Sequence, residues 1–188
     1  MIKAILRHYL PLAVVITALC GLGYLIPQQV LRLGGNDPQI QMAQDAAASL
    51  TAGEPLASVA PTGTLDVGES LAPFTIVYDD QGNVLAATGQ LHGQPPALPP
   101  GVFDNVRQHG EDRISWQPEA GARFAAVIER VGGAQPGFVL VARSLRETET
   151  RINTVEELAG LAWLATMAAA LVVVVLVEVI FRQAAPAR

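Results

Sequence analysis

The chain has 188 residues, a formal net charge of −5 and a mean hydropathy of +0.34. An acidic balance with no basic stripe argues against nucleic acid as a partner. The single cysteine excludes an internal disulfide framework. Two long apolar segments leave about 130 residues between them, which is the size of one ordinary domain.

The first apolar segment covers residues 10–26 and follows a short tail, residues 1–9, that carries Lys3 and Arg7. We interpret it as an uncleaved transmembrane anchor, because no small-residue cleavage site follows it. A cleaved signal peptide is the alternative, since a charged start and an apolar middle are common to both. Cys20 lies inside this segment, so its thiol is expected in lipid and reduced.

The predicted folded domain spans residues 27–157, including a helix at its exit. A glycine-containing break at residues 34–36 precedes a helix that starts at Asp37 and Pro38. Asp caps free backbone N–H groups, and Pro suits the first helical position. The helix is expected to pack against the domain core and to end at Gly53. Its apolar face consists of Ile40, Ala43, Ala47 and Leu50.

The remainder of the domain predicts a loop, a hairpin, a short helix and three strands. Residues 54–73 are rich in Gly, Pro, Ser and Thr and are interpreted as loop or linker. Residues 74–89 form a predicted hairpin whose turn lies at residues 79–83. A proline-rich loop, residues 93–101, leads to a helix over residues 102–109, and a polyproline recognition segment is the alternative for that loop. Strands are predicted at residues 113–117, 122–131 and 137–143.

The second apolar segment covers residues 158–181 and contains a single charge, Glu178. Such a run makes roughly 36 Å of helix, enough to cross a hydrocarbon core of about 30 Å. We expect Glu178 to pair with Arg182, one helical turn away, near the cytoplasmic surface, and a proton or ion relay is the alternative.

Basic residues near the two segments predict the orientation of the chain. The tails, residues 1–9 and 182–188, carry Lys and Arg but neither Asp nor Glu. Short basic tails stay in the cytoplasm, whereas a long domain is translocated largely regardless of its charge. We therefore expect both termini in the cytoplasm and the domain outside it.

The order of elements in residues 38–151 resembles the extracytoplasmic PAS-like (Cache) sensor domains of bacterial histidine kinases and related receptors. The likeness rests on a helix after a membrane span, a hairpin carrying YDDQGNVLAATG, a crossing helix and three further strands. It implies an α+β fold with a five-stranded antiparallel sheet between two transmembrane helices. It also implies a small-molecule pocket on one face of the sheet, and the inner membrane of a bacterium as the location.

The resemblance also bears on how a signal is passed on. Such receptors continue after the second span into a kinase, cyclase or methyl-accepting segment, whereas only residues 182–188 follow it in this sequence. We therefore expect a sensory or ligand-binding module that acts through a separate membrane partner. The alternative is a non-catalytic accessory or structural subunit of a larger membrane complex.

A seam of residues near and inside the second apolar segment is a candidate interface. Small and apolar side chains at helical intervals let helix backbones approach each other closely. We interpret the seam as pairing with a second copy of the chain or with a receptor, and packing of the chain's own two spans is the alternative. The seam residues in this prediction are Leu145, Ile152, Val155, Ala162 and Thr166.

The candidate ligand residues are Tyr78, Arg107, Trp116 and Arg123. A guanidinium beside an aromatic wall suits a small carboxylate, because the fork binds two oxygens while the ring supplies apolar area. The alternative is structural: Trp116 as a core anchor, Tyr78 as a strand residue at the rim, and both arginines in solvent.

Catalysis has little support in the sequence. It contains no phosphate-binding glycine loop, no nucleophile elbow and no metal-ligand spacing of His and Cys. We therefore expect no enzyme activity, no cofactor and no metal, and a lipid bilayer as the main surrounding of the two apolar segments.

Overall fold

The computed structural model describes residues 2–33, 37–61, 63 and 65–184. It divides the chain into a helical unit, Met1–Arg32 with Thr150–Arg188, and a sheet unit, Leu33–Glu149. The glycine-containing break predicted at residues 34–36 lies outside the described residues, and so does the Asp37 side chain that was expected to cap the next helix.

The helical unit consists of two long apolar helices. Helix α1 spans Ile2–Leu33, and helix α5 spans Arg146–Ala184, of which the part from Thr150 belongs to this unit. Both are long and apolar enough to cross a membrane. Their large side chains are exposed rather than packed, for example Leu19 at 63% and Phe181 at 73%. A core helix of a soluble protein would bury such residues.

The apolar helices are longer than the predicted spans they contain. Helix α1 runs through Pro27, the predicted start of the domain, and continues to Leu33. Proline inside an apolar helix removes one backbone hydrogen bond without ending the helix when the surroundings support it. The predicted spans, residues 10–26 and 158–181, thus lie well inside α1 and α5.

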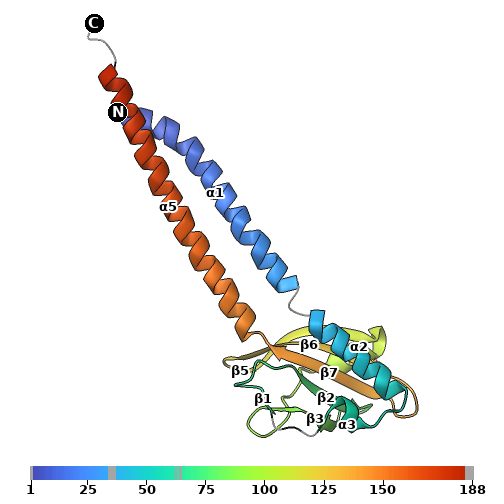
Figure 1. Ribbon diagram of the computed structural model, residues 1–188. Coiled ribbons are helices and arrows are strands. Elements are labelled where there is room, and N and C mark those ends of the chain that lie inside the picture. The colour runs from blue at the N-terminus through green and yellow to red at the C-terminus, as the bar shows by residue number, and fades with distance from the viewer. Residues whose placement is uncertain (1, 34–36, 62, 64, 185–188) are drawn as a thin grey trace. The chain divides into compact units, whose positions relative to one another are not determined.

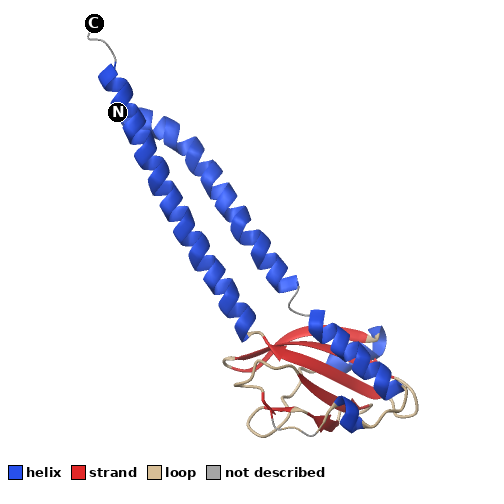
Figure 2. Cartoon of the chain, in the orientation of Figure 1, coloured by secondary structure: helices blue, strands red, loops and turns tan. Residues whose placement is uncertain are grey.

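The sheet unit contains the five-stranded antiparallel sheet that the resemblance implied (Figures 1 and 2). The strand order is β3-β2-β7-β6-β5, so β2 and β7, far apart in the sequence, lie side by side. All four neighbouring pairs are antiparallel. The strands are β2 (Phe74–Asp79), β3 (Val84–Ala87), β5 (Glu111–Glu119), β6 (Ala122–Val131) and β7 (Gly137–Ser144).

Side chains alternate along the strands and divide the core between the two faces of the sheet. One side, here the valine face, includes Val77, Val127, Val131, Val139 and Val141 and is covered by helices α2 (Asp37–Thr51) and α3 (Leu56–Val59). Helix α2 crosses β6 and β7 in Figure 1. The expectation that this helix packs on the core is confirmed, since Ala43 is 0% exposed and packs against Val127 and Val141.

The opposite side, here the aromatic face, holds the larger core. Helix α4 (Val102–His109) covers part of it with Val102 and Val106. This helix has the predicted bounds and ends at Gly110, whose φ of 86° is the left-handed conformation that favours glycine. The core side chains beneath it include Phe74, Ile76, Tyr78, Trp116, Phe124 and Phe138.

The segment interpreted as loop or linker is more structured than predicted. Residues 54–73 contain α3 and strand β1 (Leu65–Asp66), which pairs in parallel with β4 (Gly89–Gln90). Apolar side chains beside these elements explain the difference. Val67, directly after β1, is 2% exposed on the aromatic face, and Ala60, directly after α3, is 4% exposed on the valine face. Composition indicated a linker, and the burial of a few apolar residues made the segment part of the core.

Candidate functional site

The two aromatic residues predicted to contact a ligand lie in the core of the aromatic face. Trp116 packs against Phe124, with ring centroids 5.2 Å apart, and its Nε1 donates a hydrogen bond to the Ala97 carbonyl oxygen at 3.2 Å. Tyr78 packs edge-on to Phe103 at 5.0 Å. Both are buried, with 7% and 5% exposure respectively. Burial raises the pKa of Tyr78 far above its ordinary value, so its hydroxyl stays neutral.

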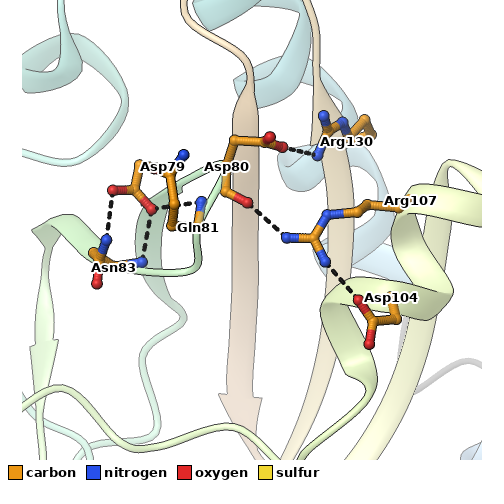
Figure 3. A network of polar contacts seen from close by, with 7 residues as sticks. All are labelled: Asp79, Asp80, Gln81, Asn83, Asp104, Arg107 and Arg130. Carbon is orange, nitrogen blue, oxygen red and sulfur yellow. Dashed lines mark hydrogen bonds and ion pairs between the residues drawn. The ribbon is translucent and has the colours of Figure 1, made fainter.

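Arg107, a third predicted ligand residue, belongs to a polar cluster at the edge of this core (Figure 3). From α4, Arg107 Nη2 donates to the Asp80 carbonyl oxygen and Nη1 to Asp104 Oδ1, both at 2.6 Å. Its guanidinium carbon lies 5.2 Å from the centre of the Phe138 ring. The aromatic wall expected beside an arginine is therefore present, while its two Nη atoms already have partners in the protein.

A second arginine of the same cluster is not among the residues predicted from the sequence. Arg130, on β6, lies with its guanidinium carbon 4.7 Å from the same Phe138 ring, and its Nη1 is 2.7 Å from Asp80 Oδ1. These two polar atoms are shielded from solvent. In the sequence, Arg130 comes at the end of an apolar strand pattern, and nothing local marks it as a member of the cluster. It stands directly opposite Phe138 only once β6 pairs with β7.

Arg123, the fourth predicted ligand residue, lies apart from this cluster. It stands near the start of β6, whereas Arg130 stands near its end, so at about 3.3 Å per strand residue the two are separated by roughly 23 Å. Arg123 Nη1 donates to Glu149 Oε1 at 3.1 Å. The fold brings Tyr78 and Arg107 close to a common ring pair, Phe103 and Phe138, and leaves Arg123 with a different partner.

The predicted turn at residues 79–83 is confirmed and closely hydrogen-bonded (Figure 3). Asp79 Oδ1 accepts from the Gln81 and Asn83 backbone N–H groups at 2.9 and 2.8 Å, and Oδ2 accepts from Asn83 Nδ2 at 2.8 Å. Gly82 has a φ of 86°. These bonds, that from the Asn83 side chain above all, lower the pKa of the Asp79 carboxyl, which stays ionised at neutral pH.

A pocket of about 740 Å³ opens at the valine face where α2 ends, and we call it the α2-end pocket. Its walls come from the end of α2 and the residues after it, the end of β2, and the turn between β6 and β7. The lining residues are 50–56, 77–79, 134–137, Leu85 and Val131. Of the four residues predicted to bind a ligand, only Tyr78 is among them, and its ring packs on the opposite face.

Two walls of this pocket are held together where the β6–β7 turn approaches Thr51 at the end of α2. The Gly132 backbone N–H donates to Thr51 Oγ1 at 3.1 Å, which joins the β6–β7 turn to the end of α2. A Cβ at Gly133 would lie 2.8 Å from the Thr51 carbonyl oxygen, and Gly133 has a φ of 79°. Only glycine accommodates both the contact and the backbone conformation. In the sequence, residues 132 and 133 are a Gly-Gly pair, which is typical of a turn and does not by itself indicate a pocket.

The residues predicted as an interface lie on and next to α5. Leu145 precedes the helix, and its carbonyl oxygen accepts from the Glu149 N–H at 2.8 Å. Within the helical unit, Ile152 and Val155 are half-buried, whereas Ala162 and Thr166 are exposed. Thr166 Oγ1 donates to the Ala162 carbonyl oxygen of its own helix. Pairing with a second chain stays a prediction.

The chain's own two apolar helices contact each other, as the alternative interpretation of the seam expected. Tyr9 Oη donates to the Met167 carbonyl oxygen at 3.3 Å, and Trp163 Nε1 donates to Thr17 Oγ1 at 3.0 Å. Glu178 Oε1 lies 3.6 Å from His8 Nε2 on α1. The expected pairing of Glu178 with Arg182 stays a prediction.

Comparisons with known proteins add no family. No protein-family model matches this chain, and no curated protein sequence matches it. Among the residues that the structure describes, no group of three or more His, Cys, Asp or Glu side chains is arranged to hold a metal ion.

Proposed function

We propose that this protein is a membrane-anchored module that binds a small molecule in the α2-end pocket and acts through a separate membrane partner. The observation that carries the proposal is the pocket itself. Its volume of about 740 Å³ falls within the range of about 300–1,000 Å³ that is typical of small-molecule sites. Buried apolar residues, Val77 and Val131, form part of its lining, and polar groups stand around them.

The membrane part of the proposal is supported by the two apolar helices. Exposed leucine, valine and isoleucine side chains follow α1 and α5 along the whole of their apolar stretches. Lipid solvates such side chains, whereas water does not. In this proposal both termini are cytoplasmic and the sheet unit is extracytoplasmic, in the inner membrane of a bacterium, as expected from the basic tails and the PAS-like resemblance.

The choice of face follows from packing. On the aromatic face, rings fill the space beneath α4, with Phe103 and Phe138 centroids 4.7 Å apart and Phe74 and Phe124 centroids 5.4 Å apart. On the valine face, the α2-end pocket has a volume suited to a small molecule. The resemblance implied a pocket on one face of the sheet, and the valine face is the one we propose.

A ligand panel tests the proposal on the full chain in a mild detergent. Organic acids, amino acids, amines and neutral analogues are screened for a saturable rise in thermal stability, which a ligand of the folded state must produce. Ala134→Phe places a ring in the pocket and should abolish the rise, whereas Ala72→Phe, at another exposed alanine, should preserve it. No stabilisation by any member of the panel would contradict ligand binding.

A second candidate function, an accessory or structural subunit, is favoured by one edge of the sheet. Strand β3 is an edge strand with Val84 and Leu85 exposed at 45% and 50%. Exposed apolar residues on an unpaired edge suit docking of another protein. Purification in gentle detergent separates the two functions. A kinase, cyclase or chemoreceptor as the stoichiometric companion supports sensing, and a transport or respiratory assembly supports the accessory role.

A further inference from the structure

We infer that the α2-end pocket takes an organic cation with an apolar body, such as an alkyl or aryl ammonium, rather than the carboxylate expected from the sequence. The inference rests on the proposed function, because it names the ligand class of the same pocket. It is carried by the charges that line the pocket and by the position of the arginines.

Two carboxylates line the pocket and lie on different segments. Glu54 follows the end of α2 and is exposed, and its Oε2 accepts one long hydrogen bond, from Ser58 Oγ at 3.3 Å. A carboxylate has acceptor sites for about four hydrogen bonds, so Glu54 has capacity for a ligand N–H. Asp79, at the end of β2, adds a second negative charge, which its three turn hydrogen bonds hold in the ionised form.

The end of helix α2 adds to the negative potential. The pocket is lined by Leu50 to Gly53, the last turn of α2 and the residues that follow it. Carbonyl oxygens at the carboxyl end of a helix carry the equivalent of about half a negative charge, and they favour a cation. The bond from Gly132 to Thr51 keeps this helix end against the β6–β7 turn.

The charge of the described lining residues is not balanced by a basic side chain. None of the described residues that line the pocket is Lys, Arg or His. Arg130 is adjacent in sequence to Val131, which lines the pocket, but successive strand residues point to opposite faces, and Arg130 lies over the Phe138 ring on the aromatic face. A carboxylate in the pocket would therefore face Glu54 and Asp79 with no counter-charge among the lining residues.

The apolar part of the pocket lining favours a ligand with an apolar body. Val77 and Val131 are each 3% exposed, and Leu56, Leu85 and Pro136 surround them. Burying apolar ligand surface here is favourable by about 25 cal/mol per Å². A bare metal ion or a fully polar amine would leave this surface uncovered, so the pocket suits a cation attached to a hydrocarbon or an aromatic ring.

Three probes of the same size and different charge test the inference: benzylammonium, benzyl alcohol and benzoate. Each is titrated into the ¹⁵N-labelled full chain in detergent micelles, and the amide signals of Gly53, Ala134 and Gln135 report binding at the pocket. We expect saturable shifts with benzylammonium at an affinity roughly tenfold above that of benzoate, since several weak electrostatic contributions act together. Ala134→Phe should remove the shifts, which separates pocket binding from partition into micelles.

A matched pair of variants assigns the charge effect. Glu54→Gln should weaken benzylammonium two- to fivefold, as is typical of an exposed ion pair, and leave benzyl alcohol unchanged. Glu69→Gln makes the same charge change at an exposed residue outside the pocket lining and should alter neither. Benzoate or benzyl alcohol binding as tightly as benzylammonium would overturn the cation inference and leave the proposed binding function intact. Absence of pocket shifts with all three probes would count against both.

Discussion

At the scale of single residues, the fold of the sheet unit depends on glycines that have no room for a side chain. A Cβ at Gly89 would lie 2.5 Å from Val67 Cγ1 and 2.7 Å from Phe74 Cβ. Both neighbours are buried in the aromatic core, at 2% and 1% exposure, and have no free space into which to move. Gly89 therefore permits β4 to pass directly over the core.

Gly89→Ala should lower the free energy of unfolding by about 1–3 kcal/mol, as overpacking of a filled core does. Gly132→Ala is the matched control, since its added Cβ would lie at ordinary contact distances from Thr51, 3.6 Å from Cγ2 and 3.9 Å from Oγ1, and should change stability little. Urea titrations followed by Trp116 fluorescence, in a Trp163→Phe background, measure both. Equal effects of the two substitutions would contradict the packing argument.

A pair of carboxylates on neighbouring strands makes stability depend on pH. Glu111 and Glu129 stand opposite each other in the β5–β6 register. Burial, and next the nearby Glu111 charge, raise the pKa of Glu129, while the hydrogen bond from Arg113 lowers the pKa of Glu111. An acid with a raised folded-state pKa contributes stability below its unfolded pKa and loses that contribution as pH rises through the folded value. Ionised Glu129 is thus unfavourable at neutral pH.

Glu129→Gln should therefore raise the free energy of unfolding at neutral pH, by less than about 1 kcal/mol because the site is partly exposed. The gain should shrink as pH falls through the raised pKa of Glu129. Glu111→Gln should act in the opposite direction, since an acid with a lowered pKa stabilises the fold above its unfolded pKa. Urea titrations at several pH values measure both, and a pH-independent gain for Glu129→Gln would refute the assignment.

At the scale of elements, the polar cluster around Arg107 and Arg130 joins four parts of the sheet unit. Asp80 in the β2–β3 turn receives Arg107 from α4 and Arg130 from β6, and both guanidinium groups lie over Phe138 of β7. A charged group on an aromatic face contributes roughly 0.5–2 kcal/mol, more when it is shielded from water. The cluster therefore connects elements of the fold, and its two arginines already make polar contacts to protein groups.

The contact between helices α1 and α5 within one chain can be tested by cysteine cross-linking. Cys20 and Val155 line one groove of about 320 Å³ between the two helices. Under mild oxidation, Val155→Cys should form a disulfide with Cys20 inside one chain, detected as faster migration on a non-reducing gel. In a Cys20→Ser background the same variant reports pairing between chains, as does Ile152→Cys. If Val155→Cys and Ile152→Cys each give cross-linked dimers in the Cys20→Ser background, and Val155→Cys gives no internal disulfide when Cys20 is present, the result would favour the homodimer.

At the scale of the whole molecule, the two units differ in how much apolar side-chain surface they expose. The helical unit exposes its apolar side chains, whereas the sheet unit buries Phe, Val and Ile in cores on both faces. The hydrophobic effect disfavours the first arrangement in water and favours the second. This difference between the two surfaces is the physical basis of the proposed anchor.

Labelling with a membrane-impermeant maleimide tests the proposed topology in a Cys20→Ser background. Glu69→Cys, at an exposed residue of the sheet unit, should react in intact cells. Lys3→Cys, in the amino-terminal tail, should react only after the membrane is permeabilised. The reverse pattern would place the domain in the cytoplasm and contradict the orientation argued from the basic tails.

Local patterns determined much of the fold by themselves. The apolar face of residues 37–51 and the turn at residues 79–83 each depend on neighbours a few residues away, and the structure confirms both. The two long apolar helices were equally predictable, because a long apolar segment is identified from its length and composition alone. These features required no knowledge of distant contacts.

Only the tertiary structure decided where a site lies. The α2-end pocket joins Thr51, Asp79 and Gln135, which are far apart in the sequence, and Arg130 meets Phe138 only through the pairing of β6 with β7. Tertiary packing also placed α3 and β1 against the core, in a segment whose composition indicated a linker. Composition and periodicity record local preference, whereas a pocket is made by long-range pairing, and no local signal carries that information.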